Sequence, residues 1–485
     1  MKNTFAPINR IPLGVLSLIP DYCDTDDELI ALTRVCRSWR QEFISRSSLW
    51  TCLYCASVEE TRVYLERSKA SPLEIRLRET GRAPFLNDAF LLTVPHLNRL
   101  KSLTLSGSST NLLKLTKYFG SPTPLLEKLN LNFACTETPI IQDVVFDGDL
   151  SSLRDLRLAG VIANLAWESL SNLTTFDFCR IPSKRISVTR LLNFFGRAPL
   201  RKIRLQDAFP NSSDAPPVRI VSLPHLKSLT IVAQPVHTIL LNHLLIPTGA
   251  SLSQGFNLSG NKSPIPTYLP KTLKNLKHVS HITSINLSFK IRMFLRLAGP
   301  NGTHYVFGHW VGPSPLSLVS DYHVLQSLTL FQISGVERLT IDQYATPPPT
   351  RIETSPVYLT LLLMNNLRTL TLMDCLNPPF ILALDPKRNP SGTVLCPKLE
   401  ELILYIVDDD AFPVSGLLEM AKQRASGGAK LSTITIVGWR EFVPAKEVLK
   451  LRDYVSWLEY RLDDVVPEWS VIPTDADNTG YKSDW

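Results

Sequence analysis

The residue types that carry out catalysis or bind metals are sparse in this sequence. Cys52 and Cys55 form a C-x-x-C pair, a spacing that serves zinc binding or thiol–disulfide chemistry. No second pair and no suitably spaced histidine accompanies them, so two partly buried structural thiols are the favoured interpretation. His304 and His309 are five residues apart in a glycine-containing segment that is predicted as a loop. A helical metal motif places its histidines four residues apart, so this pair predicts no metal site.

An acidic run offers a second possible site. Asp408, Asp409 and Asp410 follow a strand-like apolar segment, and a solvated turn is favoured there over a cation site. The phosphate-binding loop G-x-x-x-x-G-K-S/T, the nucleophile motif G-x-S-x-G and the dinucleotide fingerprint are absent from the sequence. The sequence therefore predicts an interaction protein without catalytic residues, metal or cofactor.

The composition is that of a globular protein from a reducing compartment. The chain has 485 residues, 44% of them hydrophobic and 20% charged, with a net charge of +7. This charge permits anionic partners without requiring nucleic acid. The eight cysteines lack the density of a disulfide framework, which predicts a cytoplasmic location, a nuclear one, or both. No apolar run reaches the ~18 residues of a spanning helix, so no membrane partner is expected.

An apolar hexamer recurs along most of the chain and must supply the elements that position any binding residues. In "LKSLTL", from Leu100, the first, fourth and sixth residues are apolar. The same spacing recurs in hexamers that begin at Leu126, Leu153, Leu173, Leu200, Leu226, Ile282, Leu325, Val336, Leu367, Leu399 and Leu431. This recurrence predicts one short strand per unit, and since one strand cannot bury its own apolar face, the units must stack.

The hexamers resemble those of leucine-rich repeats. The resemblance implies an irregular leucine-rich-repeat-like solenoid over residues 59–440, one array with a shared core, and an ordinary globular core is the alternative. Irregular turns are expected because the Asn or Cys that usually follows the repeat is missing from nearly every copy. Helical spacing from Val448 predicts a C-terminal capping helix within residues 441–472, and residues 473–485 are predicted to be a disordered tail.

The segment before the hexamers, residues 8–50, predicts three short helical pieces. The middle helix, within residues 25–43, carries one apolar stripe, made of Leu32, Val35, Cys36, Trp39 and Phe43. A segment of this length buries too little surface to be stable alone, so it needs a neighbour. Whether Trp39 packs the segment's own core or faces a partner stays open at this point.

Four pieces of this segment together resemble an F-box, the adaptor-binding module of SCF-type ubiquitin ligases. They are Ile11–Pro12, "VLSLI" at 15–19, "LTRVCRSWR" at 32–40 and "SLW" at 48–50. The whole chain further resembles F-box-like proteins of basidiomycete fungi. The resemblance implies an α/β chain that begins with an F-box-like helical domain over residues 1–58. It also implies an adaptor-facing surface formed or supported by Ile11, Pro12, Leu16, Ile19, Leu32, Val35, Trp39, Leu49 and Trp50.

One position departs from the family pattern. The family has Leu-Pro-x-Glu where this chain has Ile11, Pro12, Leu13 and Gly14. Gly14 lacks the carboxylate and lowers helix propensity by about 1 kcal/mol relative to Ala. The departure implies weaker adaptor binding.

Basic residues gather in one part of the predicted array. Between Arg180 and Arg204 there are eight basic residues and no acidic one. Strand alternation places Lys128, Arg157, Lys202 and Arg204 on one face, where they are candidates to bind a target through carboxylate or phosphate groups. Nucleic acid is the less favoured anion, because no aromatic stacking residues are interleaved with the basic ones. A solvated face is the simpler alternative.

Two functions remain open. In the first, the chain is the substrate receptor of an SCF-type ligase: the box binds the adaptor and through it cullin, and the array binds a target protein with an acidic or phosphorylated segment. In the second, the chain is a scaffold outside any ligase, with a decayed box, that binds protein or nucleic acid. The Gly14 departure is the only sequence feature that favours the second function.

Overall fold

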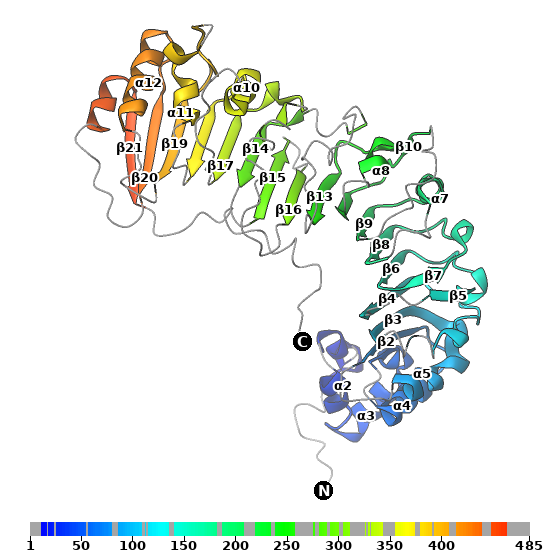
Figure 1. Ribbon diagram of the computed structural model, residues 1–485. Helices are drawn as coiled ribbons and strands as arrows, with labels where there is room; N and C mark the ends of the chain where they lie inside the picture. The colour runs from blue at the N-terminus through cyan, green and yellow to red at the C-terminus, as the bar shows by residue number, and fades with distance from the viewer. Residues whose placement is uncertain are drawn as a thin grey trace. The chain divides into compact units, whose positions relative to one another are not determined.

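The computed structural model of the chain (Figure 1) describes residues 11–16, 18–23, 26–54, 57–79, 86–108, 112, 115–134, 140–181, 187–207, 219–233, 238–257, 275–276, 281–288, 292–299, 304–310, 325, 328–329, 331–342, 355–373, 379–389, 392–406, 414–438 and 448–462. The chain divides into two compact units, Met1–Pro216 and Pro217–Trp485. Asp408, Asp409, Asp410 and the predicted tail, 473–485, lie outside the described residues.

Unit 1 begins with short helices. They are α1 (Leu13–Leu16), η2 (Ile19–Tyr22), α2 (Asp26–Leu32), α3 (Arg37–Ser45) and η3 (Ser47–Trp50). We call residues 11–50 the N-terminal helical segment. The helices α4 (Val58–Ser68) and α5 (Leu86–Thr93) follow, and α4 packs against η3.

A parallel sheet forms the rest of unit 1. Its strands pair in the order β1–β2–β3–β4–β6–β8–β9. They span Cys52–Leu53, Leu73–Arg78, Leu100–Ser108, Lys128–Ala134, Asp155–Ala159, Thr175–Cys179 and Lys202–Gln206. The remaining elements are η4 (Val94–Arg99), η5 (Thr116–Tyr118), η6 (Val145–Gly148), η7 (Trp167–Ser169), α7 (Val188–Phe195) and the separate parallel pair β5 (Ile140–Val144) and β7 (Ile162–Asn164).

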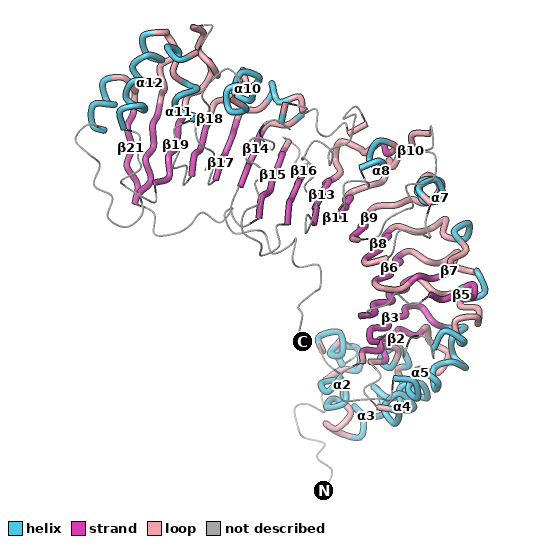
Figure 2. Tube along the Cα trace, viewed as in Figure 1, coloured by secondary structure: helices cyan, strands magenta, loops and turns pink. Residues whose placement is uncertain are grey.

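The apolar hexamer residues build the core of unit 1. One register row crosses the sheet and is fully buried: Leu103, Leu129, Leu156, Phe176 and Ile203. Strand residues alternate between the two faces, so the polar residues between these apolar ones share the opposite face. Strands lie along one side of the unit and the connecting helices and loops along the other (Figure 2).

Unit 2 contains a longer, mixed sheet in the order β11–β13–β16–β15–β14–β17–β18–β19–β20–β21. The strands are β11 (Ser228–Ala233), β13 (Ser251–Asn257), β14 (Ser284–Ser288), β15 (Arg292–Ala298), β16 (His304–Trp310), β17 (Arg338–Asp342), β18 (Thr369–Met373), β19 (Glu401–Ile406), β20 (Thr433–Gly438) and β21 (Trp457–Leu462). Its other elements are β10 (Val221–Ser222), α8 (Thr238–Asn242), β12 (Leu244–Leu245), η12 (Ile333–Gly335), α10 (Pro356–Leu363), α11 (Pro379–Leu384), η14 (Pro386–Arg388), α12 (Val414–Ser426) and η16 (Val448–Asp453).

The predicted fold class, a short helical F-box followed by one irregular leucine-rich-repeat-like solenoid over residues 59–440, is wrong. The chain is a mixed α/β protein whose strands pair mostly in parallel, and it divides into two compact units at Pro216, inside the predicted array. The strands β14, β15 and β16 pair antiparallel. The hexamer specifies a buried strand but not the connection to the next strand, so it cannot distinguish one uniform stack from separate α/β units.

Two local predictions also fail. The hexamer from Leu325 forms no strand in its described residues, since Leu325 and Leu328 are buried and helical. The predicted capping helix is absent from the described part of residues 441–472, which forms η16 and then strand β21, paired parallel with β20. Apolar and polar residues alternate in "LEYRL", from Leu458, which is typical of a strand, whereas the spacing of the surrounding apolar residues is typical of a helix. The sequence alone does not decide between the two.

Candidate protein-binding surfaces

The predicted helix over residues 25–43 is two helices, with a break at residues 33–36. The Thr33 hydroxyl donates to the carbonyl oxygen of Ile30, and Cys36 has extended backbone where α3 begins. The Arg40 side chain crosses the break and donates from Nε to the carbonyl oxygen of Thr33 at 2.9 Å. The break separates Val35 from the stripe to which it was assigned, and its side chain is 43% exposed.

Both tryptophans of the N-terminal helical segment are buried. Trp39 is 5% exposed and meets Phe43 edge to face, with ring centroids 5.6 Å apart. The partly buried Ile11, Ile19, Leu32, Cys36 and Leu49 pack around this pair. These residues can support a binding surface from beneath, but the two aromatic rings do not form one in this conformation.

Trp50 ties the segment to the rest of unit 1. Its side chain is fully buried, its Nε1 donates to the carbonyl oxygen of Phe43 at 2.9 Å, and its ring meets Tyr64 of α4 at 5.2 Å. The Arg67 guanidinium lies 4.3 Å from the centre of the Trp50 ring. Trp50 therefore couples the stability of the segment to helix α4, across the predicted domain boundary at residue 58.

The exposed apolar residues of the segment are less conspicuous in the sequence. They include five residues that are exposed to solvent: Pro12, Val15, Leu18, Tyr22 and Val35. Of the predicted adaptor-facing residues, Leu16 lies in α1 but its side chain is outside the described residues. A Cβ added at Gly14 would meet nothing within 4 Å, so no packing contact requires glycine there.

A shallow basic groove of about 630 Å³ lies between α3 and the end of α4. One stripe of α3 lines it with Arg37, Arg40 and Gln41, and α4 contributes Arg67, with Lys69 just beyond its end. Glu66 is the only carboxylate among the residues that line the groove. This side of the segment therefore favours contact with an acidic surface.

The four predicted target-binding residues lie on one face of the unit 1 sheet. Two register rows cross β3, β4, β6, β8 and β9 and define what we call the polar sheet face. The first row is Ser102, Lys128, Asp155, Thr175 and Lys202, and the second is Thr104, Asn130, Arg157, Asp177 and Arg204. Parallel pairing in register thus places Lys128, Arg157, Lys202 and Arg204 together.

Two of these four cations are already paired with carboxylates. Arg157 binds Asp155 in a bidentate pair, with Nε–Oδ1 at 3.1 Å and Nη2–Oδ2 at 3.0 Å. Arg204 Nη1 lies 3.9 Å from Asp177 Oδ2, a looser ion pair, and Nη2 donates to Gln206. Lys128 and Lys202 are exposed and form no ion pair within the described part of the chain.

Burial affects the charge on this face. Desolvation raises the pKa of Asp177, although Arg204, Arg157 and Lys202 act in the opposite direction. The Arg204 side chain is 13% exposed, and its Nε has no hydrogen-bond acceptor among the residues that the structure describes. Strand alternation also places Asp155 on this face, but the pairing of the arginines with Asp155 and Asp177 is missed from the sequence because both carboxylates lie outside the basic run. Aligning the fifth residues of the hexamers, Arg157, Asp177 and Arg204, would have revealed the alternation of charge.

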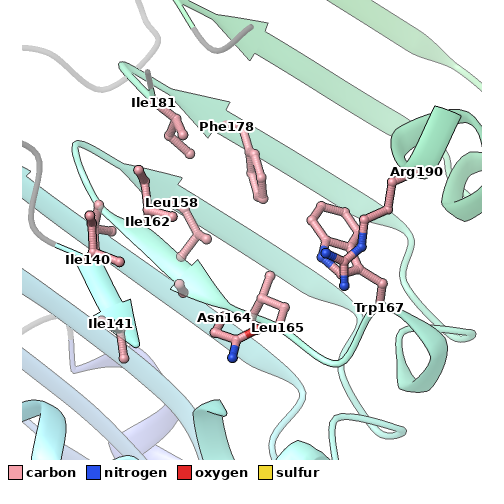
Figure 3. A pocket seen from close by; sticks show the side chains of 12 residues that line it. Ile140, Ile141, Leu158, Ile162, Asn164, Leu165, Trp167, Phe178, Ile181 and Arg190 are labelled. Carbon is pink, nitrogen blue, oxygen red and sulfur yellow. The ribbon is translucent and has the colours of Figure 1, made fainter. Parts of the chain in front are cut away.

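A cavity of about 320 Å³ lies on the other side of the same sheet (Figure 3). Hydrophobic residues of β5, β6, β7 and β8 line it, including Ile140, Leu158, Ile162 and Phe178, and polar groups, among them Asn164 and Arg190, contribute about as much of the lining. Trp167 and Arg190 lie together at one end, with the guanidinium carbon 5.6 Å from the ring centre. The sequence does not reveal this cavity, because its residues come from four strands and three connections.

The candidates for chemistry are dispersed. Cys52 is a half-buried cysteine in β1 that forms no disulfide, and Cys55 lies outside the described residues. His304 and His309 belong to strand β16 rather than to the predicted loop, and their side chains are not described. Within the described residues, no group of three or more His, Cys, Asp or Glu side chains is placed to hold a metal ion.

Comparisons with known proteins give no family assignment. No protein-family model matches the chain, and no curated protein matches it. Among the described helices, none is long and apolar enough to cross a membrane.

Proposed function

We propose that this chain is the substrate-receptor subunit of an SCF-type ubiquitin ligase and is not itself an enzyme. The N-terminal helical segment would bind the adaptor, and through it cullin, while the polar sheet face of unit 1 would bind the target. The proposal rests on the resemblance of residues 11–50 to an F-box and places the protein in the cytoplasm, the nucleus or both. The subunit would act by proximity, raising the effective concentration of target lysines near the charged enzyme.

The observation that carries the proposal is the division of apolar residues within the segment. Trp39 and Phe43 form a small internal core, whereas Val15, Leu18 and Val35 remain exposed. A small helical unit that keeps aliphatic side chains in water gains stability when a partner covers them. The adaptor-facing set therefore centres on Val35 and the α1–η2 region, with Trp39 and Trp50 as supports beneath it.

The target side of the proposal depends on the polar sheet face. Lys128 and Lys202 lie in one register row and form no ion pair among the described residues, whereas Arg157 and Arg204 face carboxylates of the same sheet. A target with an acidic or phosphorylated segment would meet the two lysines first and then compete with Asp177 for Arg204. Its affinity should fall as salt rises, because exposed charges are screened within about 8 Å at physiological ionic strength.

The test of adaptor binding is a calorimetric titration of the intact chain with the adaptor subunit of its host. Saturable one-to-one binding is expected. An intact, folded chain that ignores the adaptor at micromolar concentrations would contradict the receptor proposal.

A scaffold with a decayed box is the second candidate, and Gly14 is the observation that favours it. Since the site of its missing Cβ is open, Gly14→Glu can restore the carboxylate of the family pattern without a steric clash. If wild type fails to bind the adaptor and Gly14→Glu binds it, the box has decayed and the scaffold function is supported. If both bind, with Gly14→Glu tighter, the receptor proposal stands with a weakened contact.

A further inference from the structure

The cavity behind the unit 1 sheet has the character of a small-molecule site. Its volume, about 320 Å³, lies at the lower end of the range for ligand pockets, roughly 300–1,000 Å³. Leu158 and Phe178 line it from β6 and β8, next in sequence to Arg157 and Asp177 of the polar sheet face. Because successive strand residues point to opposite faces, the cavity is separate from the proposed target surface.

One end of the cavity carries a cation, the exposed side chain of Arg190. Arg190 occupies the first turn of α7, where Ser187 is the N-cap and accepts from the Arg190 backbone N–H at 3.1 Å. A cation in the first turn opposes the helix dipole, so this placement costs stability unless an anion lies nearby. No carboxylate in the described part of the chain pairs with Arg190.

The Arg190 guanidinium is also held in place by an aromatic neighbour before any ligand binds. It lies over the Trp167 ring, and Trp167 in turn packs edge to face against Phe194 at 5.2 Å. Figure 3 shows the Arg190 side chain reaching from α7 to Trp167 at the end of the apolar walls. A guanidinium that rests on an aromatic ring through a cation–π contact keeps N–H donors available for a bidentate acceptor.

From this geometry we infer that the cavity binds a small amphipathic monocarboxylate. The apolar body lies among Leu158, Ile162 and Phe178, and the carboxylate accepts two hydrogen bonds from Arg190. A single guanidinium matches one planar carboxylate, and the modest volume restricts the body to a short chain or one small ring system. This inference is independent of the proposed ligase function.

The test uses octanoate as the anionic probe and octan-1-ol as its neutral counterpart, with the intact chain. Binding is followed by calorimetry and by competition between the two probes. Octanoate should bind in the micromolar range. Arg190→Gln should weaken octanoate binding at least tenfold and leave octan-1-ol binding unchanged. Arg197→Gln, which removes an exposed arginine just beyond α7 that does not line the cavity, is the matched control and should change neither.

A second test fills the cavity with a larger side chain. Ala163 lies on β7 and lines the cavity, so Ala163→Phe should abolish binding of both probes while circular dichroism shows an unchanged fold. Failure of octanoate to bind the wild-type chain would overturn the inference. Equal loss of octanoate and octan-1-ol affinity in Arg190→Gln would overturn the assignment of the anionic end, as would binding that survives in a folded Ala163→Phe variant.

Discussion

In the N-terminal helical segment and on the polar sheet face of unit 1, the residues that most suggest a binding site are engaged within the protein itself. The physical reason differs between the two regions. In the segment, Trp39 and Trp50 are covered by neighbouring side chains, and smaller aliphatic residues such as Val35 face solvent. On the sheet, Arg157 and Arg204 face Asp155 and Asp177, and Lys128 and Lys202 form no ion pair with any described residue.

The comparison shows that residue type identifies a candidate surface better than it identifies the contact residues on it. Large aromatic rings gain most from burial, so a small helical unit uses them for its own core first. Arginine forms bidentate pairs more readily than lysine, so internal carboxylates engage it first. The residues left for a partner are therefore the aliphatic side chains of the segment and the lysines of the sheet.

The largest expected effect is the loss of Trp50. Trp50→Ala removes a fully buried ring that contacts Tyr64 and donates to the Phe43 carbonyl, and should destabilise unit 1 by about 3–5 kcal/mol. Trp457→Ala is the control, since that ring is 65% exposed and its loss should cost no more than about 0.5 kcal/mol. Urea denaturation followed by far-UV circular dichroism measures both, and similar costs would contradict the supporting role of Trp50.

The two tryptophans of the segment should also differ when each is replaced by Phe, which removes the indole N–H and part of the ring volume at both positions. Trp50→Phe leaves the buried Phe43 carbonyl without its donor and should cost about 1–3 kcal/mol. Trp39→Phe should cost less, because Trp39 Nε1 has no acceptor within the described part of the chain. Thermal unfolding of the two variants side by side measures the difference, and the reverse order would contradict the assigned packing.

On the sheet, replacing the more buried arginine should cost more stability than replacing the exposed one. Arg157→Gln breaks a pair in which Arg157 is well exposed, and should change stability by at most about 1 kcal/mol. Arg204→Gln leaves Asp177 largely buried without its principal cation and should cost more than Arg157→Gln. Chemical denaturation at pH 7 compares them, and equal effects would show that the Arg204–Asp177 contact contributes nothing beyond a surface pair.

The smallest expected effect is a pH dependence from Asp177. Desolvation raises the pKa of Asp177 in the folded protein, so the folded state binds this proton more tightly than the unfolded chain does. The resulting stabilisation is present below the unfolded pKa, near 3.8, and is lost as pH rises through the folded pKa. The stability of Asp177→Asn relative to wild type should therefore increase as pH rises through this window in paired unfolding experiments. A relative decrease would mean that attraction to Arg204 outweighs burial.

The sequence predicts some of this arrangement and not the rest. Hexamer spacing places Arg157 and Arg204 on one face with Lys128 and Lys202, because period-two alternation and in-register parallel pairing follow from the apolar positions. The division into two units is not visible, since the hexamers continue on both sides of Pro216.

The break between α2 and α3 could not be predicted either. Residues 33–36 contain neither Gly nor Pro, and the break depends on local hydrogen bonds from Thr33 and to its carbonyl oxygen. Without the break, Val35 belongs to the same stripe as Trp39, and the two appear interchangeable as contact residues. The structure separates them, with Val35 exposed and Trp39 buried.

The central claim, that exposed aliphatic residues of the N-terminal helical segment bind an SCF adaptor, is tested most directly by a matched pair of valine variants. Val35→Asp places a charge on the proposed contact surface, and Val63→Asp places one on an exposed position of α4, where Val63 is 37% exposed. In titrations of the intact, folded chains with the adaptor, Val35→Asp should weaken binding at least tenfold, about 1.4 kcal/mol, and Val63→Asp should bind as wild type does. Equal affinities for Val35→Asp, Val63→Asp and wild type would contradict the account.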